Sequence, residues 1–485
     1  MTGLTRRRFF SAGAALAPFS RVRGANDAIR LAVVGVGSTV KIGGRGKADA
    51  RDFAKIPGVR VAAFCDVDRA NLDPEVQAWR DRGEKVEAYT DVRKLLENKE
   101  IDVVSITTPN HWHALVAIWA CQAGKDVFVQ KPASHNLFEG RQMVEAARKY
   151  KRIVQCPSGS RSPVGVVEAA DWARKGNLGK ILYIHGVNFG ARTSIGKVTG
   201  EQRIPDTIDY DLWCGPSPVL PLMRQNLHYD WHWTWPYGDG ELGNWGPHIL
   251  DGCRMAIGAD SMPHHGISMG GRFGYSDDGQ TPNSHFMYFD YQPAPIIFEI
   301  RGLPKDKSFL RAPWDKNRNV SMDTYCGIRQ GTVIRCEGGY VAQNKAFEQN
   351  GKLIKEFQPT TPDLYVNFIQ AVRSRRQADL AADILEGHRT VSLIHMGNIS
   401  YRLGATVSAG EIKERLLGRK ELLSAFERFK EHLRANDADV DKMICGPMLT
   451  VDPARERFTG DFAAEANKLA RGSYRKPFVV PEAIS

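Results

Sequence analysis

The feature that most constrains the fold is a strict alternation of buried strands and amphipathic helices over residues 29–157. Apolar runs such as "IRLAVVGV" and "IDVVSITTP" predict strands buried on both faces, and "HALVAIWACQAG" between such runs predicts a helix. This alternation predicts one parallel sheet with helices on both faces. Because ligands bind at the carboxyl ends of the strands in such sheets, we expect the functional site there.

The first predicted strand ends in a glycine turn. Gly35 and Gly37 fill the first two positions of the dinucleotide-binding fingerprint, where the first glycine permits the tight turn and the second lets the backbone approach a pyrophosphate. Val40 stands where a third glycine is usual, and "STVKI" precedes Gly43–Gly46. We interpret this stretch as an insertion in the phosphate loop, followed by a helix over "KADARDFAKI".

The second predicted strand, "VRVAAFCDVD", contains Asp66 near its end. A carboxylate at this place can accept hydrogen bonds from both ribose hydroxyls, which favours NAD over NADP. The alternative is that Asp66 caps a helix or a turn. Arg45 and Arg69 are candidates for holding a 2′-phosphate, so NADP stays possible.

Two further motifs follow predicted strands, "TTPNHWH" at Thr107–His113 and "QKP" at Gln130–Pro132. Their position at the carboxyl ends of strands predicts that they face the ligand. The candidates for cofactor binding are Gly35, Gly37, Asp66, Thr108, Pro109, Asn110, His113 and Lys131.

Several motifs in order resemble the Gfo/Idh/MocA oxidoreductases, the family of glucose–fructose oxidoreductase and inositol dehydrogenase. They are "TTPNHWHALVAIWACQAGKDVFVQKPASHNLFEGRQMVEAARK", "GNWGPHILD", "GGRFGYSDDGQTPN" and "ILEGHRTVSLIHMGNISYRLG". The resemblance implies a Rossmann domain over residues 28–157. It also implies an α/β domain over 158–404, whose open, mainly antiparallel sheet forms the face of a homo-dimer or homo-tetramer. Alternating patterns such as "SHFMYFDYQ" agree with strands there.

The family's Glu-Lys-Pro motif appears here as Gln130-Lys131-Pro132. The resemblance implies that Lys131 is catalytic, holds a substrate hydroxyl and the nicotinamide carboxamide, and stabilises developing alkoxide charge. The glutamine removes a neighbouring charge, so we expect a lowered pKa for Lys131. The alternative is a structural lysine at a strand end.

The family's Asp-x-x-x-His motif maps onto Asn244 and His248, which share a face if the segment is helical. The resemblance implies that His248 takes a proton from the substrate hydroxyl. Asn244 can orient a sugar hydroxyl but carries no charge, and Asp251 could partly replace the missing acid. The alternative is a structural His248.

The segment "HYDWHWTWPYGDGELGN" is rich in aromatic residues. Trp231 is a candidate for stacking on a sugar ring, and packing in the core is the alternative. His228, Asp230 and His232 alternate, but no second ligand cluster stands out, and hydride transfer from a nicotinamide needs no metal. We therefore expect no metal site.

The N-terminus carries a basic stretch before a run of small residues. Thr5, Arg6, Arg7 and Phe9 fit a twin-arginine signal, so residues 1–27 are expected to be a signal peptide that directs the protein to the periplasm or beyond. Ala25 is a weakly marked cleavage candidate. A disordered basic tail is the alternative.

Composition excludes several classes of protein. Hydrophobic residues make up 42% and no later apolar run is long enough to span a membrane. The net charge is +11, of which five charges come from arginines in the first 25 residues, so no nucleic-acid partner is expected. The eight cysteines form no CxxC pair, which argues against a disulfide framework or a zinc site. Residues 405–485 are expected to be a helical extension for packing or oligomer contacts.

Together these features predict an exported NAD(P)-dependent oxidoreductase that acts on a CH–OH group of a sugar or sugar derivative. A twin-arginine signal moves folded proteins and the periplasm offers no maintained nicotinamide pool, so we expect a tightly bound cofactor. An NAD-dependent glycosidase using transient sugar oxidation is one alternative. A non-catalytic sugar-binding sensor is another alternative. Gln130 and Asn244 depart from the family motifs and keep this alternative open, whereas the retained Lys131 and His248 favour an enzyme.

Overall fold

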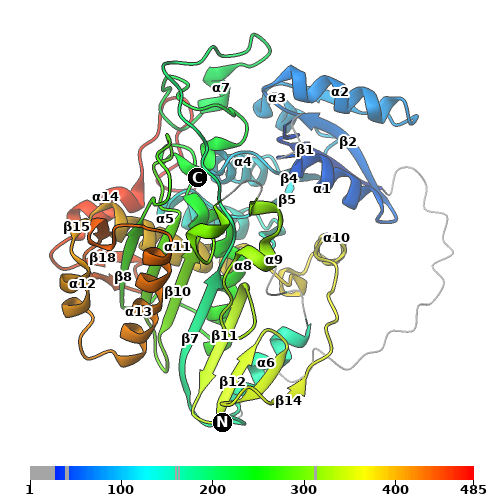
Figure 1. Cartoon of the computed structure of the whole chain (residues 1–485). Helices are drawn as coiled ribbons and strands as arrows, with labels where there is room; N and C mark the ends of the chain where they lie inside the picture. The colour runs from blue at the N-terminus through cyan, green and yellow to red at the C-terminus, as the bar shows by residue number, and fades with distance from the viewer. Residues whose placement is uncertain (1–27, 39–42, 159–160, 162–163, 311–313, 485) are drawn as a thin grey trace.

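The computed structural model describes residues 28–38, 43–158, 161, 164–310 and 314–484, which form two packed units, each built on one sheet (Figure 1). The N-terminal sheet has six parallel strands in the order β3-β2-β1-β4-β5-β6. Its strands are β1 (Ile29–Val34), β2 (Val59–Cys65), β3 (Glu87–Tyr89), β4 (Val103–Ile106), β5 (Asp126–Val129) and β6 (Val154–Gln155). The predicted doubly wound Rossmann sheet is thereby confirmed.

Alternate side chains of β1 enter the two helix layers of this unit. Leu31 and Val33 pack with helices α1, α2 and α10, whereas Ala32 and Val34 pack with α3, α4 and α5. A central parallel strand covered on both faces is mostly apolar, and β4 is buried throughout; the hydroxyl of its one polar residue, Ser105, donates to Asp49 at 3.4 Å. The helices are α1 (Arg45–Ala54), α2 (Arg69–Arg80), α3 (Val92–Glu97), α4 (Asn110–Gln122), α5 (Leu137–Lys149) and α10 (Leu364–Ser374).

The second sheet is large and mainly antiparallel, as expected. Its order is β14-β13-β12-β11-β7-β10-β9-β8-β16-β15, and β17 also pairs with β8. Among these pairs, β7 and β10 run parallel. The strands are β7 (Ile181–Asn188), β8 (His265–Gly271), β9 (Ser284–Asp290), β10 (Ile296–Arg301), β11 (Gln330–Cys336), β12 (Gly339–Ala342), β13 (Lys345–Glu348), β14 (Leu353–Glu356), β15 (Ala405–Val407), β16 (Met443–Cys445), β17 (Leu449–Asp452) and β18 (Arg457–Thr459).

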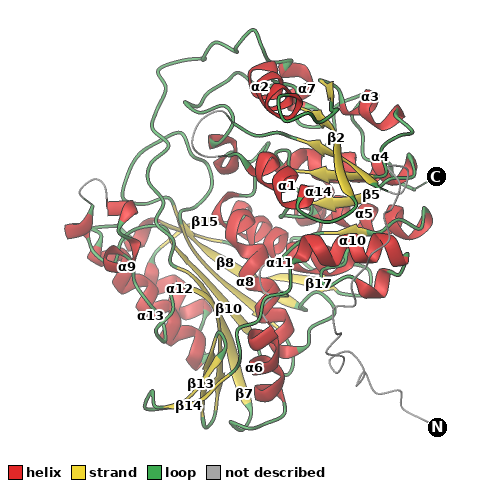
Figure 2. Cartoon of the chain, turned by 90° about the vertical axis from the view of Figure 1, so that its right-hand side faces the viewer, coloured by secondary structure: helices red, strands yellow, loops and turns green. Residues whose placement is uncertain are grey.

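Helices cover both faces of this sheet (Figure 2). On the side that adjoins the first unit lie α6 (Val164–Arg174), α8 (Gly240–Ile257) and α11 (Ile384–Arg402). On the other side, α12 (Ala409–Arg415) and α13 (Lys420–Ala435) pack over β8 to β10. Phe286 of β9 lies against Phe426 and Phe429 of α13, with ring centroids 6.0 and 5.7 Å apart. Part of the sheet face expected to bind another subunit is therefore covered by the chain itself.

The residues after Gly404 differ from the expected helical extension. Besides α12, α13 and α14 (Ala463–Arg471), they contribute β15 to β18, and β16 and β17 both pair with β8. The chain then returns to the first unit, where the Phe478 ring lies 5.4 Å from that of Trp112. These strands have only three or four residues, too few for a two-residue alternation to stand out, so strand pairing decides their conformation. β16 and β17 pair with β8, while β15 pairs with β16 and β18 with β17.

The expected signal peptide, residues 1–27, lies outside the described residues. Within the described ranges, no helix has both the length and the apolar character needed to cross a bilayer.

Candidate active site

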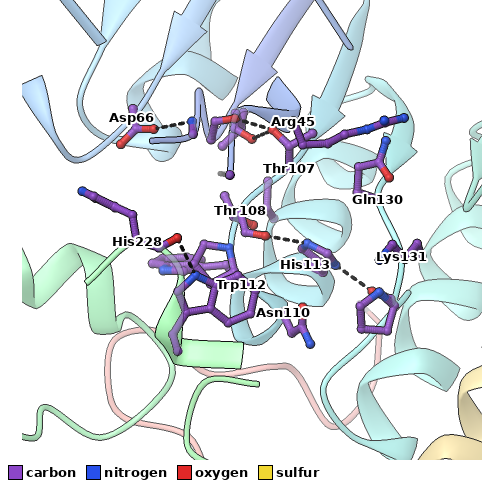
Figure 3. A pocket seen from close by; sticks show the side chains of 18 of the residues that line it. Arg45, Asp66, Thr107, Thr108, Asn110, Trp112, His113, Gln130, Lys131 and His228 are labelled. Carbon is purple, nitrogen blue, oxygen red and sulfur yellow. Dashed lines mark hydrogen bonds between the residues drawn. The ribbon is translucent and has the colours of Figure 1, made fainter. Parts of the chain in front are cut away.

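A cavity of about 550 Å³ lies at the carboxyl ends of the parallel strands. Its walls come from the turns after β1, β2, β4 and β5, from the segment 212–232, and from α8 and the start of α10. Figure 3 shows the side chains that converge on it. Of the predicted site residues, those lining it are Gly35, Gly37, Asp66, Thr108, Pro109, Asn110, His113, Lys131, Trp231, Asn244 and His248.

The glycine turn is packed as a dinucleotide cradle. Gly35 and Gly37 have φ of +87° and +100°, which L side chains rarely adopt. A Cβ on Gly35 would lie 2.7 Å from the Thr108 nitrogen, and one on Gly46 would lie 2.0 Å from the Gly35 carbonyl oxygen. Gly46, in the first turn of α1, thus provides the close helix–strand packing of the third fingerprint glycine. The cradle and the adjacent helix N-terminus fit the pyrophosphate of a dinucleotide.

The insertion that we inferred in the phosphate loop falls partly on residues 39–42, which lie outside the described ranges. Helix α1 begins at Arg45, slightly earlier than the sequence suggested.

Asp66 follows β2 and braces the glycine turn. Its Oδ2 accepts hydrogen bonds from the backbone nitrogens of Val36 at 2.8 Å and Gly37 at 3.4 Å, and its Oδ1 accepts one from the Asp68 nitrogen at 3.0 Å. Burial raises the pKa of this carboxyl. The carboxylate still lines the cavity, so a role toward ribose hydroxyls stays a prediction alongside its role in the turn.

The two arginines considered for a 2′-phosphate differ in position. Arg69 is exposed and lies outside the cavity wall, where its backbone nitrogen donates to the Thr207 carbonyl at 3.0 Å. Arg45 lines the cavity, but its Nε lies 2.8 Å from the Asp49 carboxylate.

The "TTPNHWH" motif begins α4 and supports the turn after β5. The His113 ring lies between the carbonyl oxygens of Pro132, 2.7 Å from Nδ1, and Thr108, 2.8 Å from Nε2 (Figure 3). The Asn110 amide donates to Asp239 at 2.9 Å. Both side chains are buried and hold the cavity wall in shape, so their polar groups are already used by the protein.

Lys131 and Asn244 are brought into direct contact. The Lys131 ammonium donates to the Asn244 carbonyl oxygen at 2.6 Å and to its Oδ1 at 3.0 Å. Burial lowers the pKa of Lys131 to about 8. The lowered pKa was expected, but its main cause is burial. The neighbouring Gln130 amide donates to Asp49 at 2.8 Å.

His248 lies one turn beyond Asn244 on α8 and lines the same cavity. Burial lowers its pKa to about 3, and the cations of Lys131 and Arg45 act in the same direction. The expectation of an imidazole titrating near neutrality is therefore wrong. The ring is therefore neutral above about pH 3 and has a free-base form that can accept a proton, but so low a pKa makes it a weak base.

The aromatic segment both packs and faces the cavity. Trp231 is 7% exposed and belongs to a cluster with Trp213 and Tyr237, yet it lines the cavity and stacks on His232 with centroids 3.7 Å apart. Within the described ranges, no three His, Cys, Asp or Glu residues gather as metal ligands. His228 instead pairs with Asp68 at 2.8 Å.

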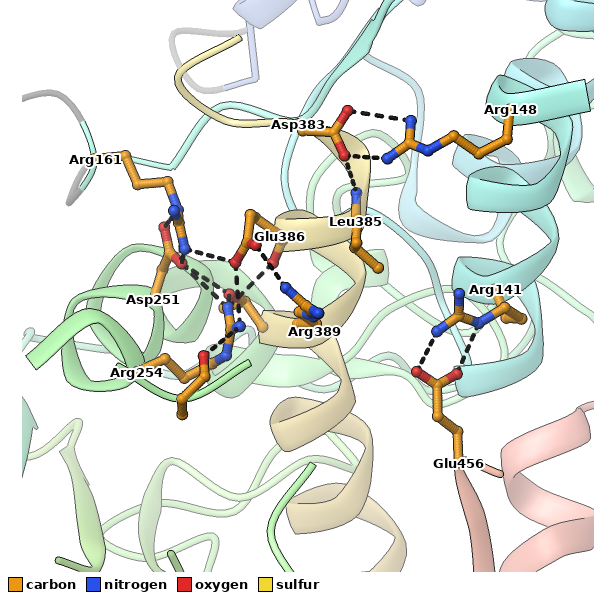
Figure 4. Close-up of polar contacts among 12 residues, drawn as sticks. Arg141, Arg148, Arg161, Asp251, Arg254, Asp383, Leu385, Glu386, Arg389 and Glu456 are labelled. Atoms are coloured by element: carbon orange, nitrogen blue, oxygen red, sulfur yellow. Dashed lines mark hydrogen bonds and ion pairs between the residues drawn. The ribbon is translucent and has the colours of Figure 1, made fainter. Parts of the chain in front are cut away.

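Asp251 requires a correction. It lies outside the cavity wall, in a buried cluster that Figure 4 shows. Arg161 donates to its Oδ2 at 2.8 Å, and Arg254 lies 3.4 Å from its Oδ1. Burial alone would raise its pKa, but these two guanidinium groups hold the pKa below its ordinary value. With its oxygens already paired, Asp251 does not face a substrate. Its charge does act to raise the pKa of His248, so it partly replaces the missing acid, as expected.

Sequence reasoning missed Glu241, which is fully buried one turn before Asn244. Its carboxylate accepts from the Asn244 amide at 3.4 Å and from Arg192 Nη2 at 3.1 Å. The spacing of positions 241, 244 and 248 on one helix face was the available signal.

Comparison with known proteins agrees with this architecture. The model of the Gfo/Idh/MocA oxidoreductase family, NAD-binding Rossmann fold, matches residues 29–157, and the model of that family's C-terminal α/β domain matches residues 181–316. A glycosyl hydrolase family 109 protein of Shewanella pealeana is 29% identical over 187 residues, 36% of this chain and 40% of that protein. An inositol 2-dehydrogenase of Salmonella typhimurium is 31% identical over 159 residues, 32% and 46% of the two chains. The chain thus spans less than half the length of these curated relatives.

Solved structures share the fold. The WlbA dehydrogenase from Bordetella pertussis, crystallised with NADH and UDP-GlcNAcA, has a TM-score of 0.53 and 16% identity over 77% of this chain and 97% of that one. The aldose-aldose oxidoreductase from Caulobacter crescentus has a TM-score of 0.51 and 14% identity over 76% and 97%. At these identities the likeness concerns the fold alone.

Proposed function

Because the chain belongs to the Gfo/Idh/MocA oxidoreductase family, with an NAD-binding Rossmann domain, we propose that it oxidises a CH–OH group of a sugar or sugar derivative. The observation that supports this most directly is the convergence of Lys131, Asn244 and His248 in the cavity that also holds the glycine turn. A substrate hydroxyl placed there meets a cation and a neutral imidazole, the two groups that proton removal requires.

In the proposed reaction, different residues of this chain accept the proton, stabilise the developing charge and contact the sugar ring. NAD, when bound, supplies the hydride acceptor. His248 Nδ1 or Nε2 accepts the hydroxyl proton, since burial keeps the ring neutral. The Lys131 ammonium, fixed by two hydrogen bonds to Asn244, stabilises the negative charge that develops on the oxygen. The aromatic wall of Trp231 and Tyr229 offers apolar surface to a sugar ring.

The cavity favours NAD over NADP in this proposal. The carboxylates in its wall are Asp66, which follows β2, and Asp91, which follows β3. Negative charge at that end opposes a 2′-phosphate, and Arg69 lies outside the wall.

Tight retention of the cofactor is part of the proposal. The segment before α8 is bound to the loop after β2 at several points: Ile208 pairs with Asp68, the Asp209 nitrogen donates to the Val67 carbonyl at 3.2 Å, and His228 pairs with Asp68. These contacts hold the segment against the nucleotide end of the cavity and support slow exchange of a bound dinucleotide. Export through Thr5, Arg6, Arg7 and Phe9 remains part of the same proposal.

A second candidate is an NAD-dependent glycosidase, in which oxidation of one sugar carbon acidifies the neighbouring C–H and permits elimination. The similarity to glycosyl hydrolase family 109 proteins favours it. His232 and Tyr229 line the cavity as further groups that could act on that proton.

One experiment tests both candidates. The purified protein is analysed for the mass and redox state of any bound nucleotide, then incubated with free sugars and with glycosides while nicotinamide absorbance and product masses are followed. Oxidised sugar supports the oxidoreductase, and a released aglycone with no net redox change supports the glycosidase. Sugar binding with neither product would contradict both and favour the sensor.

A further inference from the structure

Glu241 is a buried acid beside the proposed reacting groups. It lies on α8, three residues before Asn244 and seven before His248, so the three side chains share one helix face. Its exposed fraction is 0%. Because a buried carboxylate is costly unless it is paired, its partners indicate why it is there.

Two partners anchor the carboxylate from the side of β7. Oε1 accepts from the Asn188 amide at 2.9 Å and from Arg192 Nη2 at 3.1 Å, and Oε2 accepts from Arg192 Nε. The remaining contact, at 3.4 Å, is with Asn244 Nδ2. Glu241 is therefore held rigidly on one side and turned toward Asn244 on the other.

The chemistry of the partners fixes the orientation of the Asn244 amide. A lysine ammonium only donates hydrogen bonds and a carboxylate only accepts them. The amide oxygen must therefore face Lys131, at 3.0 Å, and the amide nitrogen must face Glu241. If the amide were reversed, both contacts would be repulsive.

We propose that Glu241 is a positioning residue for the proposed reaction: it orients the Asn244 amide toward Lys131 and supplies the counter-charge of the Lys131 ammonium. The role of Glu241 in catalysis rests on the proposed function, whereas its effect on the protonation of Lys131 does not. In this chain the acid that the family motif places at position 244 stands one turn earlier on the same helix face.

The charges around Lys131 agree with this role. Burial and the guanidinium groups of Arg192 and Arg45 disfavour the ammonium, and the Glu241 carboxylate is the main charge that favours it. Cys156 also faces the lysine, but burial raises its pKa to about 12, so the thiol is neutral. The imidazoles of His113, His232 and His248 are close enough to be influenced by the lysine, and burial keeps them neutral as well.

The test measures the protonation of Lys131 directly. The intact protein is labelled briefly with acetic anhydride across a pH series, and acetylation of Lys131 is quantified by peptide mass spectrometry. Glu241→Gln keeps the size and one acceptor oxygen but removes the charge. The pH at the midpoint of Lys131 acetylation should then fall by about 1 pH unit, because the ammonium loses its counter-charge. The double variant Glu241→Gln, Asn244→Asp returns a carboxylate to the site and should restore or raise the midpoint.

Asp49→Asn is the matched control, because it removes a buried carboxylate that bonds Gln130 and pairs with Arg45. Its labelling midpoint should stay near that of the wild type. If Glu241 only anchored Arg192, Glu241→Gln would leave the midpoint unchanged, and that result would overturn the proposal. Should Glu241→Gln fail to fold by circular dichroism, Asn244→Asp alone must raise the midpoint, and an unchanged midpoint there also contradicts it. If the protein oxidised no sugar, the proposed function would fail, but the labelling result would still test the effect of Glu241 on Lys131.

Discussion

At the scale of single residues, burial sets the protonation of the two groups proposed to handle the substrate proton. The pKa of Lys131 falls to about 8 and that of His248 to about 3. In the free enzyme, kcat/KM should therefore decline as pH rises through about 8, where the ammonium is lost. It should show no decline as pH falls through the ordinary pKa of a histidine, because His248 is already neutral there.

Variants connect this pH profile to the residues. His248→Ala and Lys131→Ala should each lower turnover by roughly 10²- to 10⁴-fold without changing the fold. Lys131→Arg should move the alkaline decline to higher pH, because a guanidinium keeps its proton. If the wild-type kcat/KM declined as pH fell through about 6.5 and this decline were absent in His248→Asn, His248 would titrate at its ordinary pKa. That result would contradict the lowered pKa of His248.

Asp66 is expected to bind NAD and to brace the glycine turn at the same time. Asp66→Ala should weaken NAD binding by about 1–3 kcal/mol, as expected when hydrogen bonds to a charged group are lost. Asp66→Asn retains one acceptor oxygen for the Val36 nitrogen and separates the two roles. Calorimetry with NAD and NADP provides the measurement, and tighter binding of NADP by the wild type would refute the assignment.

At the scale of elements, the packing of α1 against β1 depends on one glycine. A Cβ on Gly46 would lie 2.0 Å from the Gly35 carbonyl oxygen, whereas one on Gly44 would meet nothing within 4 Å. Gly46→Ala should lower the free energy of unfolding by about 1–3 kcal/mol and weaken NAD binding. Gly44→Ala, the control at the N-cap of α1, meets no such clash and should cost less, about 0.5–1 kcal/mol, the loss expected when alanine stands at an N-cap. Urea unfolding and NAD titration measure both, and equal effects of the two variants would contradict the packing argument.

Helix α13 stabilises the second sheet by covering β8 to β10. Phe426 is 0% exposed there, so Phe426→Ala should lower the free energy of unfolding by about 3–5 kcal/mol. Leu417, in the loop before α13, is 54% exposed, and Leu417→Ala should stay within about 0.5 kcal/mol of the wild type. A small loss in Phe426→Ala would mean that α13 docks only loosely on the sheet.

At the scale of the whole molecule, the proposed export and the proposed retention of the cofactor belong together. Arg6→Lys with Arg7→Lys keeps the charge but removes the guanidinium groups, so a receptor-read signal should fail and the protein should remain in the cytosol. The exported wild type should contain NAD. Fractionation with nucleotide analysis provides the measurement. Normal export of the double variant would refute the twin-arginine signal, and an exported protein without nucleotide would refute cofactor trapping.

The sequence by itself determined the Rossmann domain and the general place of its site. The central strands β1 and β4 are largely apolar and the turn after β1 carries glycine, so local patterns specify these elements, and the parallel topology then brings their carboxyl ends together. The edge strand β3 (Glu87–Tyr89) is no apolar run, and its pairing with β2 decides its conformation. Lys131 could be identified from its place after a predicted strand and from the family motif, and Asn244 and His248 from the family motif, whose two positions share one helix face.

Only the tertiary structure decided how charge is distributed around those residues. Asp251 and Glu241 lie on the same helix, but Asp251 turns toward Arg161 and Arg254 while Glu241 turns toward Asn244 and Arg192. No local pattern separates these two acids, because the partners that distinguish them, Arg161 and Arg192, lie far away in the sequence. The short strands after Gly404 likewise owe their conformation to strand pairing: β16 and β17 pair with β8, and β15 and β18 pair with β16 and β17. Burial, which sets the protonation of Lys131 and His248, exists only once both units have packed around the cavity.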